Sequence, residues 1–181
     1  MSFFQQIKAV KKALSEAKQM QKLTAEELLS LDNKTLFKTL DIRLAWETRW
    51  IKSKDNYTEV YNGAKRVFYV ITQYCDEVNN GGLCQYFSNP SRLTAPYLLE
   101  SLTEIGADKY ATLLSDFLVA NNIDVSDLSS FVIKELSEFQ EQNKRYPFDA
   151  YDKTFYELYK AEPLENYLLL YVRQHIKEFE Q

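Results

Sequence analysis

Apolar side chains recur every three or four residues along most of the chain, which is the spacing of one face of an α-helix. The most regular stripe lies in the middle of the chain and consists of Val60, Ala64, Val67, Ile71, Tyr74 and Val78. No segment alternates clearly between apolar and polar residues, as a half-buried strand would. The pattern therefore predicts an all-α fold, a single compact domain (residues 1–181) of about eight to ten helices.

Capping residues divide this pattern into separate helices. Thr24 and Glu27 have the spacing of a capping box, and Asp32 or Asn33 can cap a third helix. That helix should carry Leu36, Leu40, Leu44, Trp46 and Trp50. Later helices should begin at Thr94 with Pro96, Asp127, Pro147 with Asp149, and Pro163, with stops at Gly106 and Asn121-Asn122. We expect the helix from Asp127 to continue through Phe139, and the one from Pro163 to continue through His175 to Phe179.

The first helix is basic and amphipathic. Its apolar stripe consists of Phe3, Ile7, Val10, Leu14 and Ala17, and the lysines around it are Lys8, Lys11, Lys12 and Lys18. A helix that packs against the rest of the protein is the first interpretation. The alternative is a helix that touches a membrane or an acidic partner.

The middle stripe ends at Val78 and is followed at once by Asn79-Asn80-Gly81-Gly82. We expect these residues to stop the helix and to turn the chain into the segment 83–89. At least one of Asn80, Gly81 and Gly82 should have a positive φ, which Gly adopts freely and Asn tolerates. The turn should bring Leu83, Tyr86 and Phe87 back against Val67, Ile71 and Tyr74. Gln85 and Asn89 should then bind the backbone that the turn exposes, and Glu77 should accept from a nearby donor.

Charge is divided unevenly along the chain. Residues 1–66 carry 13 Lys and Arg against 8 Asp and Glu, a net +5, whereas the remaining 9 and 18 give −9, so the whole chain carries −4. This asymmetry concerns partners rather than the fold. Two helical runs in the acidic part have carboxylates at intervals of three or four residues: Glu100, Glu104 and Asp108, and Glu135, Glu138 and Glu141. The first run forms one stripe only if its helix continues past Gly106. Neighbours at such intervals lie about 5–6 Å apart, close to the spacing of phosphates along a nucleic acid; the alternative is an ordinary solvated face.

The composition argues against several classes of chemistry. With only 4 Gly in 181 residues, glycine-rich phosphate loops are absent, and neither the G-x-x-x-x-G-K-S/T nor the G-x-S-x-G pattern occurs. One histidine, His175, and two cysteines, Cys75 and Cys84, cannot assemble an ordinary zinc site. We therefore expect no metal, no cofactor and no catalytic residues. The thiols, together with the lack of a secretory signal or a membrane span, predict a cytoplasmic protein; a homodimer is left open.

The most unusual segment joins Glu77, Asn80, Gly81, Gly82, Gln85, Tyr86 and Asn89. Paired glycines allow close approach of the backbone to a helix, a ligand or a partner, and the amides can satisfy buried backbone or orient a ligand. A structural role and a binding role are therefore both open here.

This segment resembles the pattern Glu-Val-x-Asn-Gly-Gly-Phe-x-Gln-Tyr/Phe-Phe-x-Asn of a bacterial family of largely unknown function that includes a DNA-mimic protein. Residues 77–89 match it except at Leu83, where the family usually has Phe. Two later stretches, Ser101–Ala107 and Tyr151–Tyr156, resemble further family motifs, and the second adds Asp152 to the candidate binding residues. The resemblance covers about residues 58–175, and residues 1–57 carry no motif of the family.

The resemblance implies an all-helical fold, no established enzyme activity, and a mimic that occupies the DNA-binding surface of a transcription factor. Two hypotheses follow. The first is a non-catalytic interaction protein, a DNA mimic that binds a basic DNA-binding regulator and does not itself bind nucleic acid. The second is an enzyme or small-ligand binder that uses the segment 77–89, with Glu77 as acid–base group.

Overall fold

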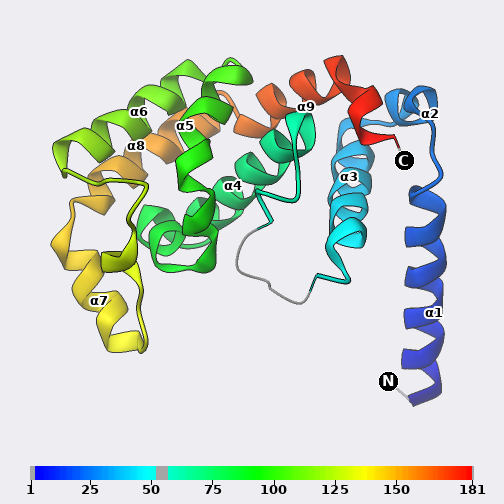
Figure 1. The fold of residues 1–181 in the computed structure, drawn as a ribbon, viewed down its shortest axis with the longest axis horizontal. Helices are drawn as coiled ribbons and strands as arrows, with labels where there is room; N and C mark the ends of the chain where they lie inside the picture. Colours follow the sequence, from blue (N-terminus) through cyan, green and yellow to red (C-terminus); the bar gives the residue numbers. More distant parts are fainter. Residues whose placement is uncertain (1–2, 52–56, 181) are drawn as a thin grey trace.

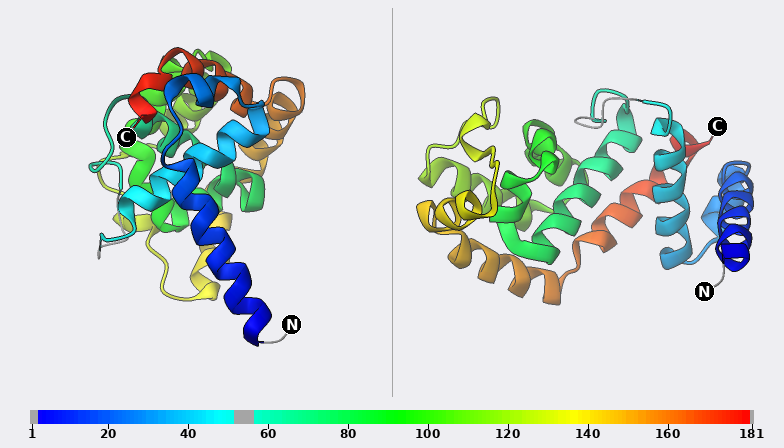
Figure 2. Two further views of the ribbon diagram at one scale, coloured as in Figure 1. Left: turned by 90° about the vertical axis from the view of Figure 1, so that its right-hand side faces the viewer. Right: turned by 90° about the horizontal axis from the view of Figure 1, so that it is seen from below.

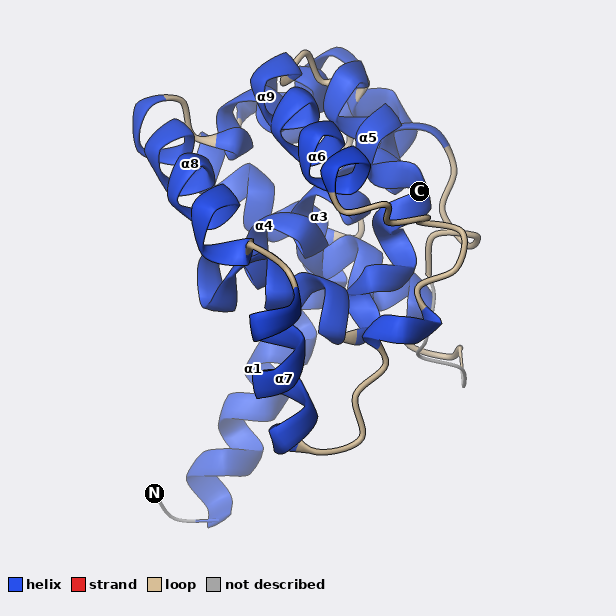
Figure 3. Cartoon of the chain, turned by 90° about the vertical axis from the view of Figure 1, so that its left-hand side faces the viewer, coloured by secondary structure: helices blue, strands red, loops and turns tan. Residues whose placement is uncertain are grey.

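The computed structural model describes residues 3–51 and 57–180, with the side chains of residues 3–6, 9, 10, 13 and 136 outside that description. Within these ranges the chain forms nine α-helices and no strand (Figures 1 and 3), which confirms the all-α prediction. The helices are α1 (Phe3–Met20), α2 (Ala25–Ser30), α3 (Asn33–Thr48), α4 (Gly63–Ser88), α5 (Ala95–Glu104), α6 (Asp108–Ala120), α7 (Leu136–Arg145), α8 (Phe148–Ala161) and α9 (Leu164–Gln174). Three short 3₁₀-helices are η1 (Pro90–Thr94), η2 (Ser129–Phe131) and η3 (Ile176–Phe179).

Helix α4 is the centre of the structure. It contacts α5, α7, α8 and α9 as well as η1 and η3, and its buried face supplies a large part of the apolar core. The helices α5, α6, α7 and α8 gather around its C-terminal half, whereas α2 and α3 lie beyond its N-terminal half (Figure 1). The long apolar stripe of the sequence therefore becomes the axis on which the other helices pack.

Helix α1 projects away from the rest of the protein (Figure 2). Its main contacts are with α3, and the stripe residues Ile7 and Leu14 stay exposed, Leu14 at 48%. The side chains of Phe3 and Val10 lie outside the described residues. The predicted helix is therefore present, while part of its predicted packing face meets solvent.

Most predicted helix boundaries are confirmed. Thr24 and Glu27 form the capping box of α2, and the Asp32 side chain accepts from the backbone N–H of Thr35 at the start of α3. Prolines occupy the N-terminal ends of α5, α8 and α9, and Gly106, with φ of 76°, follows α5. Local signals, namely side-chain caps at α2 and α3 and prolines at α5, α8 and α9, thus mark these ends.

Four expectations about helix extent are wrong. Helix α4 begins at Gly63, so Val60 lies outside it, and α3 ends at Thr48, which leaves Trp50 in a turn and 79% exposed. The segment after Asp127 breaks into η2 and α7, because the Asp127 carboxylate accepts from the nearby Ser129 N–H and residues 132–135 leave the helix. Likewise α9 ends at Gln174, and His175 separates it from the 3₁₀-helix η3.

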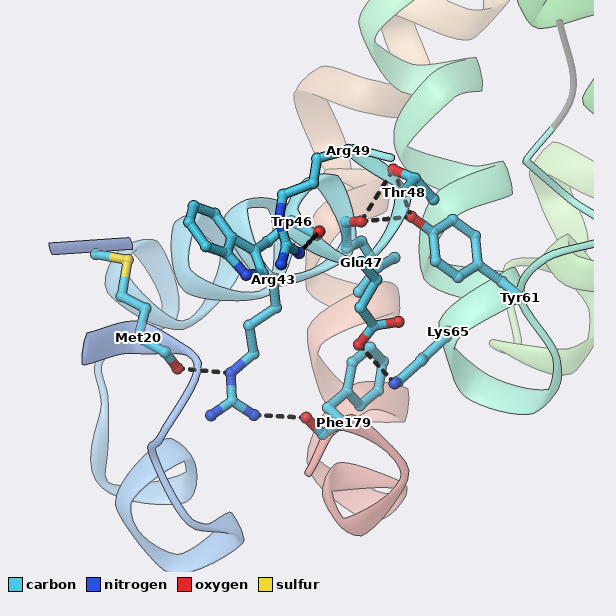
Figure 4. Close-up of polar contacts among 10 residues, drawn as sticks. Met20, Arg43, Trp46, Glu47, Thr48, Arg49, Tyr61, Lys65 and Phe179 are labelled. Atoms are coloured by element: carbon cyan, nitrogen blue, oxygen red, sulfur yellow. Dashed lines mark hydrogen bonds and ion pairs between the residues drawn. The ribbon is translucent and has the colours of Figure 1, made fainter. Parts of the chain in front are cut away.

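Distant contacts hold the two ends of the described chain together. Glu178 accepts from the Ala64 N–H and Glu180 from the Ala25 N–H, each at 2.8 Å, so these carboxylates cap α4 and α2. Arg43 of α3 is buried, with 1% exposure, and its guanidinium donates to the backbone oxygens of Met20 and Phe179 (Figure 4) and to that of Leu23. One side chain therefore joins α1, the approach to α2 and η3.

Candidate functional site

The asparagine-diglycine segment is a kink inside α4. Helical geometry continues through Asn80, two residues beyond the predicted stop at Val78. Gly81 has φ −161° and ψ 25°, and Gly82 has φ 75° and ψ −177°, after which helical geometry resumes. The predicted positive φ is thus confirmed at Gly82, in a region of backbone conformation that is almost restricted to glycine.

The kink turns the end of α4 back so that its polar side chains meet Glu77. The Glu77 carboxylate accepts hydrogen bonds from Gln85 Nε2 at 2.6 Å, Asn89 Nδ2 at 2.8 Å and Ser91 Oγ at 3.0 Å. The expectation that Gln85 and Asn89 bind exposed backbone is therefore wrong. Because they lie four residues apart on one helical face, both amides reach the same carboxylate. Ser91, which sequence reasoning missed, lies outside the motif.

Helix α8 closes the other side of the kink. Asp152 accepts from the backbone N–H of Leu83 at 2.8 Å, and the Tyr156 hydroxyl donates to the carbonyl of Val78 at 2.6 Å. Burial raises the pKa of Asp152, and the hydrogen bond from Leu83 partly offsets that rise. Two backbone groups around the kink, the Leu83 N–H and the Val78 carbonyl, thus have partners from α8.

Tyr86 is the apolar anchor of the segment. It is buried, its ring meets that of Tyr74 edge-on at 5.2 Å between centroids, and its hydroxyl pairs with Thr94 Oγ1 at 2.8 Å. The predicted return of the chain onto Tyr74 is therefore confirmed. Burial raises the pKa of Tyr86, so its hydroxyl remains protonated at neutral pH.

The geometry of the segment favours a structural role. The Glu77 carboxylate is occupied by three donors from its own segment and η1, Asp152 by Leu83, and Tyr86 by Thr94. Asn80 and Gly81 are exposed at the outer edge of the kink. The polar groups thus satisfy one another, in the way that a buried network specifies a unique packing. A binding role for these residues stays a prediction.

Replacing Glu77 by Gln should lower the free energy of unfolding by about 1–2 kcal/mol, because the new amide nitrogen faces donors and cannot accept from them. The matched control is Asp76→Asn, the neighbouring carboxylate on the same helix, which makes no hydrogen bond among the described residues. Its removal should be neutral or slightly stabilising, since burial and nearby carboxylates raise the pKa of Asp76. Urea unfolding followed by circular dichroism measures both; equal stability of the two variants would contradict the structural role.

Other reactive residues offer little chemistry. Cys75 and Cys84 are buried free thiols whose pKa values are raised, chiefly by burial, so they are poor nucleophiles. His175 stacks on Tyr171 and pairs with Glu178 at 3.0 Å. Within residues 3–51 and 57–180, no group of three His, Cys, Asp or Glu side chains is placed to hold a metal ion. The helices of the same ranges also include none with the length and apolarity needed to cross a bilayer.

The acidic candidates do not form two continuous stripes. Helix α5 ends at Glu104 and Asp108 begins α6, so only Glu100 and Glu104 share a helical turn. Glu104 accepts from the Tyr171 hydroxyl. Glu135 precedes α7, within which Glu138 accepts from the Lys134 N–H and Glu141 pairs with Lys144 at 3.0 Å.

Negative charge is nevertheless little compensated in this part of the chain. Among the described residues after position 66, lysine and arginine ion pairs engage only Glu141 and Glu162. Glu100, Glu104 and Asp108 are exposed and have no such partner. Their charges therefore add to a negative potential that a cationic partner can meet.

Comparison with known proteins identifies one protein family. Residues 59–175 match the family described as DMP19-like protein, a range that contains the kink, the Glu77 network and the closing helix α8. No curated protein and no solved structure matches the chain.

Proposed function

The chain belongs to the DMP19-like family, and from this premise we propose that it is a non-catalytic interaction protein, a DNA mimic that binds a basic DNA-binding regulator. The observation that carries the proposal is the uncompensated acidity after residue 66, where 18 Asp and Glu face 9 Lys and Arg. Exposed carboxylates on successive helical turns can present charges at about the spacing of phosphates. We place the protein in the bacterial cytoplasm, where such a regulator works.

The kink plays an indirect part in this proposal. Helices α5 and α6 carry Glu100, Glu104 and Asp108, and α5 follows directly from the segment that Glu77 and Asp152 fix. On this view the shared motif builds the scaffold, and the surface residues determine which partner binds. Scaffold and surface can then change independently among relatives.

The first test is capture of proteins from a bacterial lysate on the immobilised protein at low salt, followed by elution with duplex DNA. We expect basic, DNA-binding proteins that are released both by the DNA and by added salt, since the two would compete for the same contacts. The protein itself should not shift duplex DNA at moderate salt. A shift, or the absence of any DNA-eluted basic protein, would contradict mimicry, and a shift would point instead to the basic residues 1–66.

Charge-neutralising variants locate the surface. The triple variant Glu100→Gln, Glu104→Gln, Asp108→Asn should lose most of the captured regulator. The control variant Glu16→Gln, Glu26→Gln, Glu59→Gln removes the same net charge from residues 1–66 and should retain it. Equal loss of the regulator in both variants would indicate that net charge alone drives the association. Equal retention of the regulator would show that these residues of α5 and α6 do not belong to the interface.

A further inference from the structure

A cleft of about 500 Å³ opens between α3 and α4, on the opposite side of α3 from the buried Arg43 contacts. Its walls come from α3, from α4, from η1 and from the residues that precede α4. Small-ligand sites have volumes of about 300–1,000 Å³. The other clefts described here draw on one helix or one short surface segment, or join α3 and α9 alone.

Three tyrosines form one wall of this cleft. The ring of Tyr69 meets that of Tyr57 at 6.1 Å and that of Tyr61 at 5.4 Å between centroids. The Tyr61 hydroxyl is held in place, donating to the carbonyl of Leu44 at 2.7 Å, and burial raises the pKa of Tyr61 to about 12. Aromatic faces carry negative charge density, so such a wall favours both flat rings and cations.

Thr72 lines the same cleft with an unsatisfied hydroxyl. The residue is only 5% exposed, and its Oγ1 has no hydrogen-bond partner among the described residues. A buried hydroxyl without a partner costs about 1–3 kcal/mol. A ligand with a hydroxyl or carbonyl at this depth would supply the missing partner, so Thr72 is a second, independent mark of a binding site.

Asp41 places an unpaired negative charge at the rim. Its carboxylate is in contact with solvent, makes no ion pair with the described residues, and is nevertheless enclosed enough that burial raises the pKa of Asp41. The charge of Asp41 is also one of the causes, after burial, that raise the pKa of Asp76. A cationic ligand beside Asp41 would lower the raised pKa values of both Asp41 and Asp76, because its positive charge stabilises the two ionised carboxylates.

The described cations in and beside the cleft, Arg49 and Lys65, already have partners. Arg49 also lines the cleft, but its guanidinium is turned to Trp46, with the guanidinium carbon 4.1 Å from the Trp46 ring centroid and Nη1 donating to the Trp46 carbonyl (Figure 4). Lys65 pairs with Glu47 at 2.8 Å. Neither forms an ion pair with Asp41, so among the described residues the Asp41 carboxylate has no cationic partner.

From this arrangement we infer that the α3–α4 cleft binds a small organic cation that carries an aromatic ring. Its ammonium group pairs with Asp41, its ring packs against Tyr57, Tyr61 and Tyr69, and a polar group on the ring binds Thr72. The inference does not depend on the proposed mimicry, since none of these residues belongs to the acidic surface of α5 and α6.

Three probes of one shape test the charge requirement: tyramine, a cation; its neutral alcohol analogue tyrosol; and the anion 3-(4-hydroxyphenyl)propionate. Each is titrated into the intact protein by calorimetry and by NMR. Tyramine should bind with saturation at millimolar concentration or below and should shift resonances of the cleft. Tyrosol should bind about tenfold more weakly, and the anion should not bind measurably. Equal binding of all three, or no saturable binding of tyramine, would overturn the inference.

Two variants assign the contacts. Asp41→Asn should weaken tyramine about tenfold and leave tyrosol unchanged, whereas Asp149→Asn, a matched change on α8, should affect neither. Thr72→Val should weaken both probes about fivefold, yet the free variant should melt no lower than the parent, because the orphan hydroxyl is gone. Unchanged tyramine affinity in Asp41→Asn would show that the ammonium group does not pair with Asp41, and it would overturn the inference.

Discussion

Replacing Arg43 by Met should lower the free energy of unfolding by about 3–5 kcal/mol. The methionine side chain retains most of the apolar packing of the arginine stem, so the loss reports the guanidinium. That group donates to the carbonyls of Met20, Leu23 and Phe179, which come from three separate parts of the chain. Without it, three largely buried oxygens lose a charge-assisted donor together, and α1, α2 and η3 lose their common attachment.

Urea unfolding of the parent, Arg43→Met and Arg43→Lys measures this effect. The lysine variant should be intermediate, since one ammonium cannot reach three carbonyls in the fork geometry of a guanidinium. Arg49→Met on the same helix is the control: Arg49 is exposed and stacks on Trp46, and its loss should cost less than about 1 kcal/mol. A similar cost for Arg43→Met and Arg49→Met would mean that the buried carbonyls are satisfied in another way.

The second large effect is expected at Gly82, where alanine should cost about 2–4 kcal/mol. Two causes act together. With φ of 75° and ψ of −177° an L-residue is strained, and a Cβ would stand 2.1 Å from Asp152 Oδ2, which has to move and thereby release the Leu83 N–H. The measurement is again the urea midpoint, with circular dichroism to verify that helix content is retained.

Gly81→Ala is the matched control for Gly82→Ala. Its φ of −161° is open to any residue, and the atom nearest to a new Cβ belongs to the flexible Gln85 side chain. Gly81→Ala should therefore lower the free energy of unfolding clearly less than Gly82→Ala does. Combining Gly82→Ala with Asp152→Ala separates the two causes, since the remaining cost in that background is backbone strain alone. If both glycine variants unfold like the parent but fail to bind a partner, the segment is a functional site instead.

Sequence reasoning succeeded where the cause of a structure is local. The capping box at Thr24, the cap at Asp32 and the positive φ in the diglycine each depend on a few neighbouring residues, and each is confirmed. The predicted extent of a helix was wrong where local signals compete. Asp127 can cap a helix or accept a hydrogen bond from a nearby residue outside a helix, and only the surrounding packing decides between the two.

The remaining features depend on partners far along the chain. Nothing near Asp152 predicts that it accepts from Leu83, 69 residues away, and nothing near Arg43 marks a charged residue in mid-helix as buried. The unsatisfied Thr72 and the unpaired Asp41 are likewise properties of the assembled cleft, because each is defined by what the neighbouring helices fail to supply. Their position on apolar and polar stripes carries no such signal.

The carboxylate caps supplied by Glu178 and Glu180 have a consequence for how the protein is made. Glu180 lies 155 residues after the amide that it caps in α2, and Glu178 lies 114 residues after its partner in α4. At about 5–20 residues per second, a ribosome needs roughly ten to thirty seconds to span the larger distance. Throughout that time the nascent α2 has only its local Thr24–Glu27 capping box, while the Ala25 N–H lacks its carboxylate partner and η3 is not docked, so the packing of α2 can be completed only late in translation. The first helices to emerge are therefore among the last to become stable, and a chaperone has an interval in which to hold them.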